Sequence, residues 1–121
     1  MNAVENLDEV QYELEIDGEL VRKQIGRRVW EERGWATVAI AYQERSSGGP
    51  WKPARVALMR FRREHDMWKQ HAVITMTAYQ AFAFAGAVHT WGHDLMPEGP
   101  PPGTGGGEHA SLETAKPDDD D

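Results

Sequence analysis

The sequence predicts an α+β domain in which a curved antiparallel β-sheet of about four strands is followed by one apolar α-helix. Residues 19–76 contain four stretches in which apolar and polar side chains alternate, as they do in strands with one buried face. Turn-forming residues separate these stretches. After residue 76 the alternation stops and an alanine-rich segment begins, which is typical of a helix. We therefore assign residues 11–95 to a single β-β-β-β-α domain.

The first predicted strand spans residues 19–33, and Gly26 is a candidate for a bend within it. Strict alternation places Trp30 on the same face as Arg22 and Arg28, which predicts an exposed ring. The chain then turns at Arg33-Gly34 into residues 35–43.

The second strand, residues 35–43, has the clearest alternation in the chain. One of its faces is predicted to carry Ala36, Val38, Ile40 and Tyr42.

The third and fourth strands are predicted at residues 55–63 and 68–76. A loop at residues 46–50 precedes the third strand, and a reversal at residues 64–66 separates the two. In the fourth strand, alternation groups Trp68, Gln70, Ala72, Ile74 and Met76 on one side.

The helix is predicted at residues 78–91, because Thr77 and Gln80 have the spacing of a capping box and Gly92 is a plausible stop. Its apolar side chains point in more than one direction, so one sheet cannot cover them all. We therefore expect a homodimer that pairs through this helix. Its predicted interface is Tyr79, Phe82, Phe84, Val88 and Trp91.

Both ends of the chain are predicted to lie outside the packed domain. Residues 1–10 are expected to form an acidic, flexible N-terminus, although residues 10–16 alternate as a further strand would and Asp17-Gly18 signals a turn. Residues 96–121 are rich in Pro, Gly and acids and are expected to be disordered. This tail is interpreted as a nucleic-acid mimic that folds back on the sheet, as a binding segment for a protein partner, or as a solubilising end.

The net charge of −7 is divided into three blocks. Residues 1–19 contain seven acids and no Lys or Arg; residues 20–72 contain twelve of the thirteen Lys and Arg against five acids; residues 73–121 contain eight acids and one Lys. The basic block coincides with the predicted sheet, which favours a polyanionic partner. The chain has no Cys, no signal-peptide pattern and no long apolar run. These features predict a protein of the cytoplasm, nucleoid-associated in a bacterium, with no disulfide and no membrane partner.

Aromatic rings are interleaved with the cations of the basic block. Single-stranded nucleic acids are held through these two kinds of group, cations for phosphates and exposed rings for unpaired bases. The predicted phosphate contacts are Arg27, Arg28, Arg33, Lys52, Arg55, Arg60, Arg62 and Lys69, and the predicted stacking rings are Trp30, Trp35, Trp51 and Trp68. Trp30 and Trp51 are the preferred platforms. The alternative interpretation is a solvated sheet face with structural tryptophans.

Two other function classes receive less support. His89 and His93 lie one helical turn apart, but no third ligand has metal-site spacing, and we predict no metal or cofactor. No Ser, His and acid arrangement and no phosphate loop indicate catalysis, so we do not expect an enzyme. A protein-binding adaptor, whose basic aromatic sheet recognises an acidic partner, remains the alternative to nucleic-acid binding.

Two stretches resemble the single-stranded DNA-binding domain of the transcriptional positive coactivator family, which is related to the Whirly fold. They are residues 33–45 (Arg-Gly-Trp-Ala-Thr-Val-Ala-Ile-Ala-Tyr-Gln-Glu-Arg) and residues 49–58 (Gly-Pro-Trp-Lys-Pro-Ala-Arg-Val-Ala-Leu). Gln24-Ile25-Gly26 before Arg27-Arg28 is similar to the opening strand of that family.

The resemblance covers about 70 residues. It implies a dimer formed through the helix at residues 79–91, with single strands lying across the sheets on the Arg and Trp side chains. The chain departs from the family where residues 60–70 add a basic strand and turn, and at Ala54 and Ala57. The expected function is therefore binding of single-stranded nucleic acid, DNA before RNA, with low sequence specificity, in transcription, replication or recombination.

Overall fold

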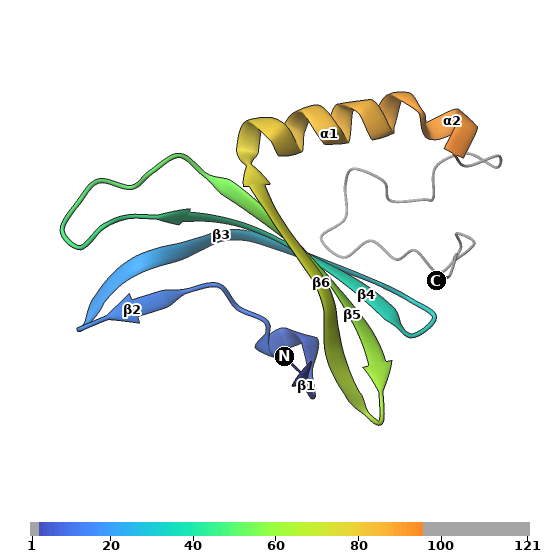
Figure 1. Ribbon diagram of the computed structural model, residues 1–121, viewed down its shortest axis with the longest axis horizontal. Helices are drawn as coiled ribbons and strands as arrows, with labels where there is room; N and C mark the ends of the chain where they lie inside the picture. Colours follow the sequence, from blue (N-terminus) through green and yellow to red (C-terminus); the bar gives the residue numbers. More distant parts are fainter. Residues whose placement is uncertain (1–2, 96–121) are drawn as a thin grey trace.

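A computed structural model of the chain describes residues 3–95. A curled antiparallel sheet is followed by a helix (Figure 1), which confirms the predicted α+β class. The sheet has six strands rather than about four, because two short strands near the N-terminus join its two edges. The elements are β1 (Ala3–Val4), the 3₁₀ helix η1 (Leu7–Glu9), β2 (Leu14–Ile16), β3 (Glu19–Glu32), β4 (Trp35–Glu44), β5 (Arg55–Glu64), β6 (Met67–Thr77), α1 (Ala78–Thr90) and α2 (Gly92–Leu95).

The strand order is β1-β6-β5-β4-β3-β2, and every neighbouring pair is antiparallel. Strands β2 to β6 therefore follow one another as a meander. Its three tight turns are at Asp17-Gly18, Arg33-Gly34 and His65-Asp66, and all six residues have positive φ. Two successive residues with positive φ are the conformation that two-residue hairpins favour. The reversals predicted at these three places are confirmed.

One face of the sheet, which we call the inner face, carries the hydrophobic core. Its fully buried side chains include Val38 and Ile40 of β4 and Phe61 of β5, each at most 1% exposed. The even-numbered residues of β4 lie on this face, as their alternation predicts. The registers place Val29 of β3 and Met59 of β5 on either side of Val38.

The N-terminal segment, residues 3–16, crosses the inner face from one edge of the sheet to the other (Figure 1). At its start β1 pairs with β6, and at its end β2 pairs with β3. Leu7 and Val10 belong to the core, 6% and 9% exposed. Residues 3–10, expected to be flexible, thus carry β1 and η1 and cover the apolar side chains that a single curled sheet leaves unprotected.

The opposite face, which we call the outer face, is divided along the strands. Near the β3–β4 and β5–β6 turns it carries basic and aromatic side chains, and toward the other end small and aliphatic ones. Cross-strand neighbours at the first end are Trp30–Thr37–Arg60–Ala72 and Glu32–Trp35–Arg62–Lys69. Those toward the second end are Arg28–Ala39–Leu58–Ile74 and Gly26–Ala41–Val56–Met76.

Two register shifts change which side chains share a face. One lies between Gln24 and Gly26 in β3, where Gly26 was predicted to bend the strand. Because a bulge inserts one residue, it reverses the alternation beyond it. Arg22 therefore lies on the inner face, with its guanidinium 4.9 Å from the centre of the Tyr12 ring, while Trp30 lies on the outer face. The predicted grouping of Arg22 with Trp30 is wrong for this reason.

The second shift lies in the β5–β6 pairing, where Arg60 pairs with Ala72 but Phe61 pairs with Gln70. Trp68 and Gln70 consequently lie on the inner face, and Ala72 and the residues after it change sides. The prediction that Trp68 shares a side with Ile74 is wrong.

Helix α1 begins with the predicted capping box. The Thr77 hydroxyl accepts a hydrogen bond from the Gln80 amide at 3.1 Å, and the Gln80 side chain accepts one from the Thr77 amide at 3.2 Å. The helix contacts β6 and β5 only lightly, and none of its residues is buried. Tyr79 and Phe82 are 83% and 81% exposed. No helix in residues 3–95 has the length and apolar composition needed to span a membrane.

The tail predicted at residues 96–121 lies outside the described residues.

Candidate nucleic-acid interface

Six of the predicted binding residues lie on the outer face. Five of them are at its basic end, and Arg28 lies one row beyond it, paired with Ala39. We call all six the outer cluster: Arg28, Trp30, Trp35, Arg60, Arg62 and Lys69. They come from the four successive long strands, β3 to β6. The meander brings them together because each outward-pointing position of one strand is level with an outward-pointing position of the next.

Trp35 is at the centre of the outer cluster. The guanidinium carbons of Arg60 and Arg62 lie 4.7 Å and 4.9 Å from the centre of its ring, within the range of a cation–π interaction. The His71 ring approaches it edge-on, with ring centres 5.3 Å apart. Both arginines are exposed and Trp35 is partly exposed. The arrangement therefore holds two cations beside an accessible aromatic surface.

Two acids lie beside the outer cluster on the same face: Glu32, at the end of β3, and Glu64. Glu64, the last residue of β5, accepts a hydrogen bond from His71 at 3.0 Å and pairs with Lys69 at 3.7 Å. The hydrogen bond from His71, then the charges of Lys69, His71 and Arg62, hold the pKa of Glu64 below its ordinary value of 4.5. Since the pKa is lowered by folding, the interaction stabilises the folded chain above pH 4.5 and is lost as the pH falls through the lowered pKa.

We expect Glu64→Gln to tighten binding of a single-stranded oligonucleotide by about two- to fivefold at low salt, because a competing negative charge is removed beside Lys69. Fluorescence anisotropy of a labelled oligonucleotide measures the change. Glu19→Gln is the matched control: Glu19 is another partly exposed acid with a lowered pKa, held by Ser47 and Gly48 at the other end of the sheet. Equal effects of the two substitutions would show that only net charge matters, and would contradict a local site.

Trp51 lies apart from the outer cluster, in the loop between β4 and β5. Its ring is flanked by Lys23 at 4.5 Å and Arg45 at 4.3 Å. Arg45 also donates to the Leu20 carbonyl at 2.9 Å and pairs with Glu19 at 3.5 Å. These contacts tie the loop to the start of β3 and give this group a structural role.

The other predicted residues are not brought to the outer cluster. Trp68 is 6% exposed and belongs to the core, with Arg63 5.4 Å from the centre of its ring. Arg27 is on the inner face, where its guanidinium donates to the carbonyls of Leu7 and Val10 in the N-terminal segment.

Three further predicted phosphate contacts also lie outside the outer cluster. Arg55 begins β5 at a position of inner-face parity, Arg33 is in the β3–β4 turn, and Lys52 is in the loop beside Trp51.

Sequence reasoning missed three residues that belong to these groups. His71 was not weighed as a neighbour of Trp35, and Lys23 and Arg45 were not assigned to Trp51. His71 lies at the register shift of β6, so alternation alone does not indicate its side. Lys23 and Arg45 reach Trp51 through pairing between β3 and the end of β4, which only the register reveals.

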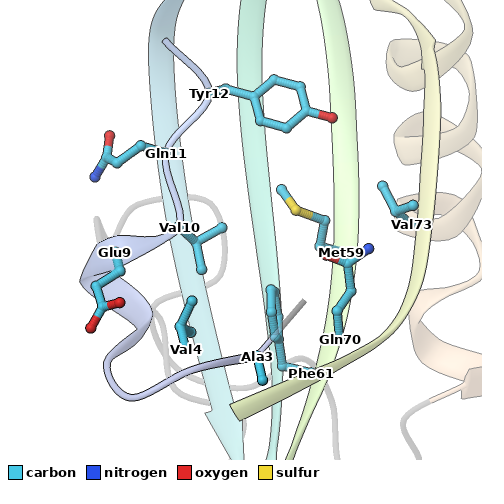
Figure 2. A pocket seen from close by; sticks show the side chains of 10 residues that line it. All are labelled: Ala3, Val4, Glu9, Val10, Gln11, Tyr12, Met59, Phe61, Gln70 and Val73. Carbon is cyan, nitrogen blue, oxygen red and sulfur yellow. The ribbon is translucent and has the colours of Figure 1, made fainter. Parts of the chain in front are cut away.

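A pocket of about 510 Å³ opens on the inner side of the sheet, between the N-terminal segment and β5–β6. Figure 2 shows Val10 and Tyr12 on one side of it, and Met59, Phe61 and Val73 on the other. None of the predicted binding residues lines it. In residues 3–95 no group of three or more His, Cys, Asp or Glu side chains is arranged to hold a metal ion.

Comparison of the chain with protein-family models, with curated proteins and with solved structures gave no match.

Proposed function

We propose that the chain is a single-stranded nucleic-acid-binding protein of low sequence specificity that acts as a homodimer. The observation that carries the proposal is the outer cluster, in which the ring of Trp35 lies beside both Arg60 and Arg62 on one face of a sheet. Phosphates would contact the cations, and an unpaired base would stack on the accessible part of a tryptophan ring.

The distribution of charge favours single strands over a duplex. Reading a duplex through the major groove requires an element that enters the groove with basic or amide side chains. Helix α1 contains no Lys or Arg. The cations lie instead on the broad face of a sheet, where stacking is open only to bases released from a duplex.

Low specificity follows from the residue types in the outer cluster. Arg and Lys contact phosphates in any sequence, and Trp stacks on any base. The outer cluster contains no Asn or Gln, the side chains that pair with adenine edges.

The homodimer is supported by the apolar surface of α1. Phe84, Val88 and Trp91 share one side of the helix, and Tyr79 and Phe82 another, by their spacing. Exposure of so many large apolar side chains on one element is uncommon in a monomer. Gly86 supports the same proposal, because glycine weakens a helix interior and a Cβ at this position would meet no atom within 4 Å. Close approach of a second chain would explain a glycine there.

We also propose kinship with the transcriptional positive coactivator family. The support is the order of the four long strands, β3 to β6, followed directly by α1. The N-terminal segment across the inner face is an addition to that plan.

A titration with a fluorescently labelled oligonucleotide tests the proposal. We expect single strands to bind more tightly than the matching duplex. The plot of log affinity against log salt is expected to have a slope of about −2 to −3, since each of the four cations of the outer cluster contributes about −0.7. Replacing both Arg60 and Arg62 with Gln should make the slope shallower by about 1.4. Absence of binding at low salt would overturn the proposal and favour a protein-binding adaptor.

A further inference from the structure

The two edges of the sheet differ in how well they are protected from pairing with another chain. One edge is β2, a strand of three residues with acids on either side and between its apolar residues: Glu13, Glu15 and Asp17. A short, charged edge strand resists pairing with another chain. The other edge is β6, which β1 covers only at Trp68 and Lys69.

Beyond that point, no strand within residues 3–95 pairs with the outer edge of β6. The exposed stretch is residues 72–77, Ala-Val-Ile-Thr-Met-Thr. It contains no charge, no Pro and several strong strand-forming residues, so none of the usual features that block edge pairing is present. Val73 and Ile74 are 49% and 57% exposed.

The open edge is continuous with the apolar surface of α1. The helix begins at Ala78, directly after the strand ends at Thr77. A partner that pairs with residues 72–77 therefore also lies beside the exposed side chains of the helix, including Tyr79 and Phe82. A second copy of this chain presents both features in the same order. Being uncharged, the edge can face itself without like-charge repulsion.

We propose that two copies of the chain pair β6 with β6 in antiparallel orientation across a two-fold axis, so that the two sheets become one and the two α1 helices meet beside the junction. The inference rests on the homodimer of the proposed function and specifies how it forms. An isologous pairing of this kind satisfies the backbone groups of both edges together. A two-fold axis perpendicular to the joined sheet keeps both outer clusters on the same side, where one long strand can reach both.

Single-cysteine variants test the pairing, because the natural chain contains no Cys. Residues that face each other across an antiparallel pair have Cα atoms about 4.5 to 5.5 Å apart, within the range that a disulfide spans. We expect Ile74→Cys or one of its neighbours in residues 72–77 to form a covalent dimer under mild oxidation. Ile16→Cys, at a similarly exposed position on the β2 edge, is the matched control and should remain uncrosslinked.

A second measurement does not depend on the exact register. Ile74→Lys should raise the dissociation constant of the dimer by about tenfold in analytical ultracentrifugation, because two ammonium groups meet near the axis and apolar contact is lost. Ile16→Lys should leave the constant unchanged. Circular dichroism of both variants confirms that they are folded.

Two results would overturn the inference: a wild-type chain that remains monomeric, or a dimer that crosslinks through Phe82→Cys but through no position of residues 72–77. These experiments contain no nucleic acid. A chain that pairs through β6 yet binds no oligonucleotide would support this inference while overturning the nucleic-acid-binding function.

Discussion

Trp35→Ala is expected to weaken binding of a single-stranded oligonucleotide by about 5- to 160-fold, which corresponds to about 1 to 3 kcal/mol. The ring is the central aromatic surface of the outer cluster, and its removal takes away both a stacking partner for a base and the cation–π contacts that orient Arg60 and Arg62. Because the substitution removes no charge, the salt slope should stay close to that of the wild type.

Anisotropy of a labelled oligonucleotide measures the affinity without relying on tryptophan emission. Trp51→Ala is the matched control, since Trp51 is also flanked by two cations but lies at the other end of the sheet. Trp51→Ala should weaken oligonucleotide binding several times less than Trp35→Ala does. If Trp51→Ala weakened binding more than Trp35→Ala, the interface would have to be moved to the loop between β4 and β5.

Leu7→Ala is expected to lower the free energy of unfolding by about 2 to 5 kcal/mol, the usual cost of removing a buried leucine side chain. Leu7 is 6% exposed and packs in the same core as Val29 and Trp68. For a small domain with a total stability of about 5 to 15 kcal/mol, this loss is large.

Urea denaturation at one fixed protein concentration measures the change, because a dimer's stability depends on concentration. Leu14→Ala is the control from the same N-terminal segment. Leu14 is 40% exposed, so its replacement should cost less than about 1 kcal/mol. Equal, small losses for both variants would show that the N-terminal segment contributes little to the fold.

The local elements of this fold were predictable from the sequence. The turns at Asp17-Gly18 and Arg33-Gly34, the buried alternate residues of β4 and the capping box at Thr77 all depend on neighbours in the chain. Backbone preferences and side-chain periodicity act over a few residues, so a short window of sequence contains the information.

Two parts of the fold were not predictable in this way. Alternation failed at the register shifts in β3 and β6, because a one-residue bulge leaves no clear mark in composition while it exchanges the two faces. The first part of the N-terminal segment, up to residue 10, was expected to be flexible. Its place across the inner face depends on Leu7 and Val10 meeting residues of β3 to β6 that are distant in sequence.

The candidate interface was likewise predictable only in part from the sequence. The sequence by itself determined that cations are concentrated in residues 20–72, where aromatic rings are interleaved with them, and that the following helix is apolar. Only the tertiary structure decided which of them share a surface: Trp35 with Arg60 and Arg62 on the outer face, Trp68 in the core, and Arg27 bound to the carbonyls of the N-terminal segment. Composition is a property of the chain, whereas a shared face depends on strand register, which hydrogen bonds between distant segments establish.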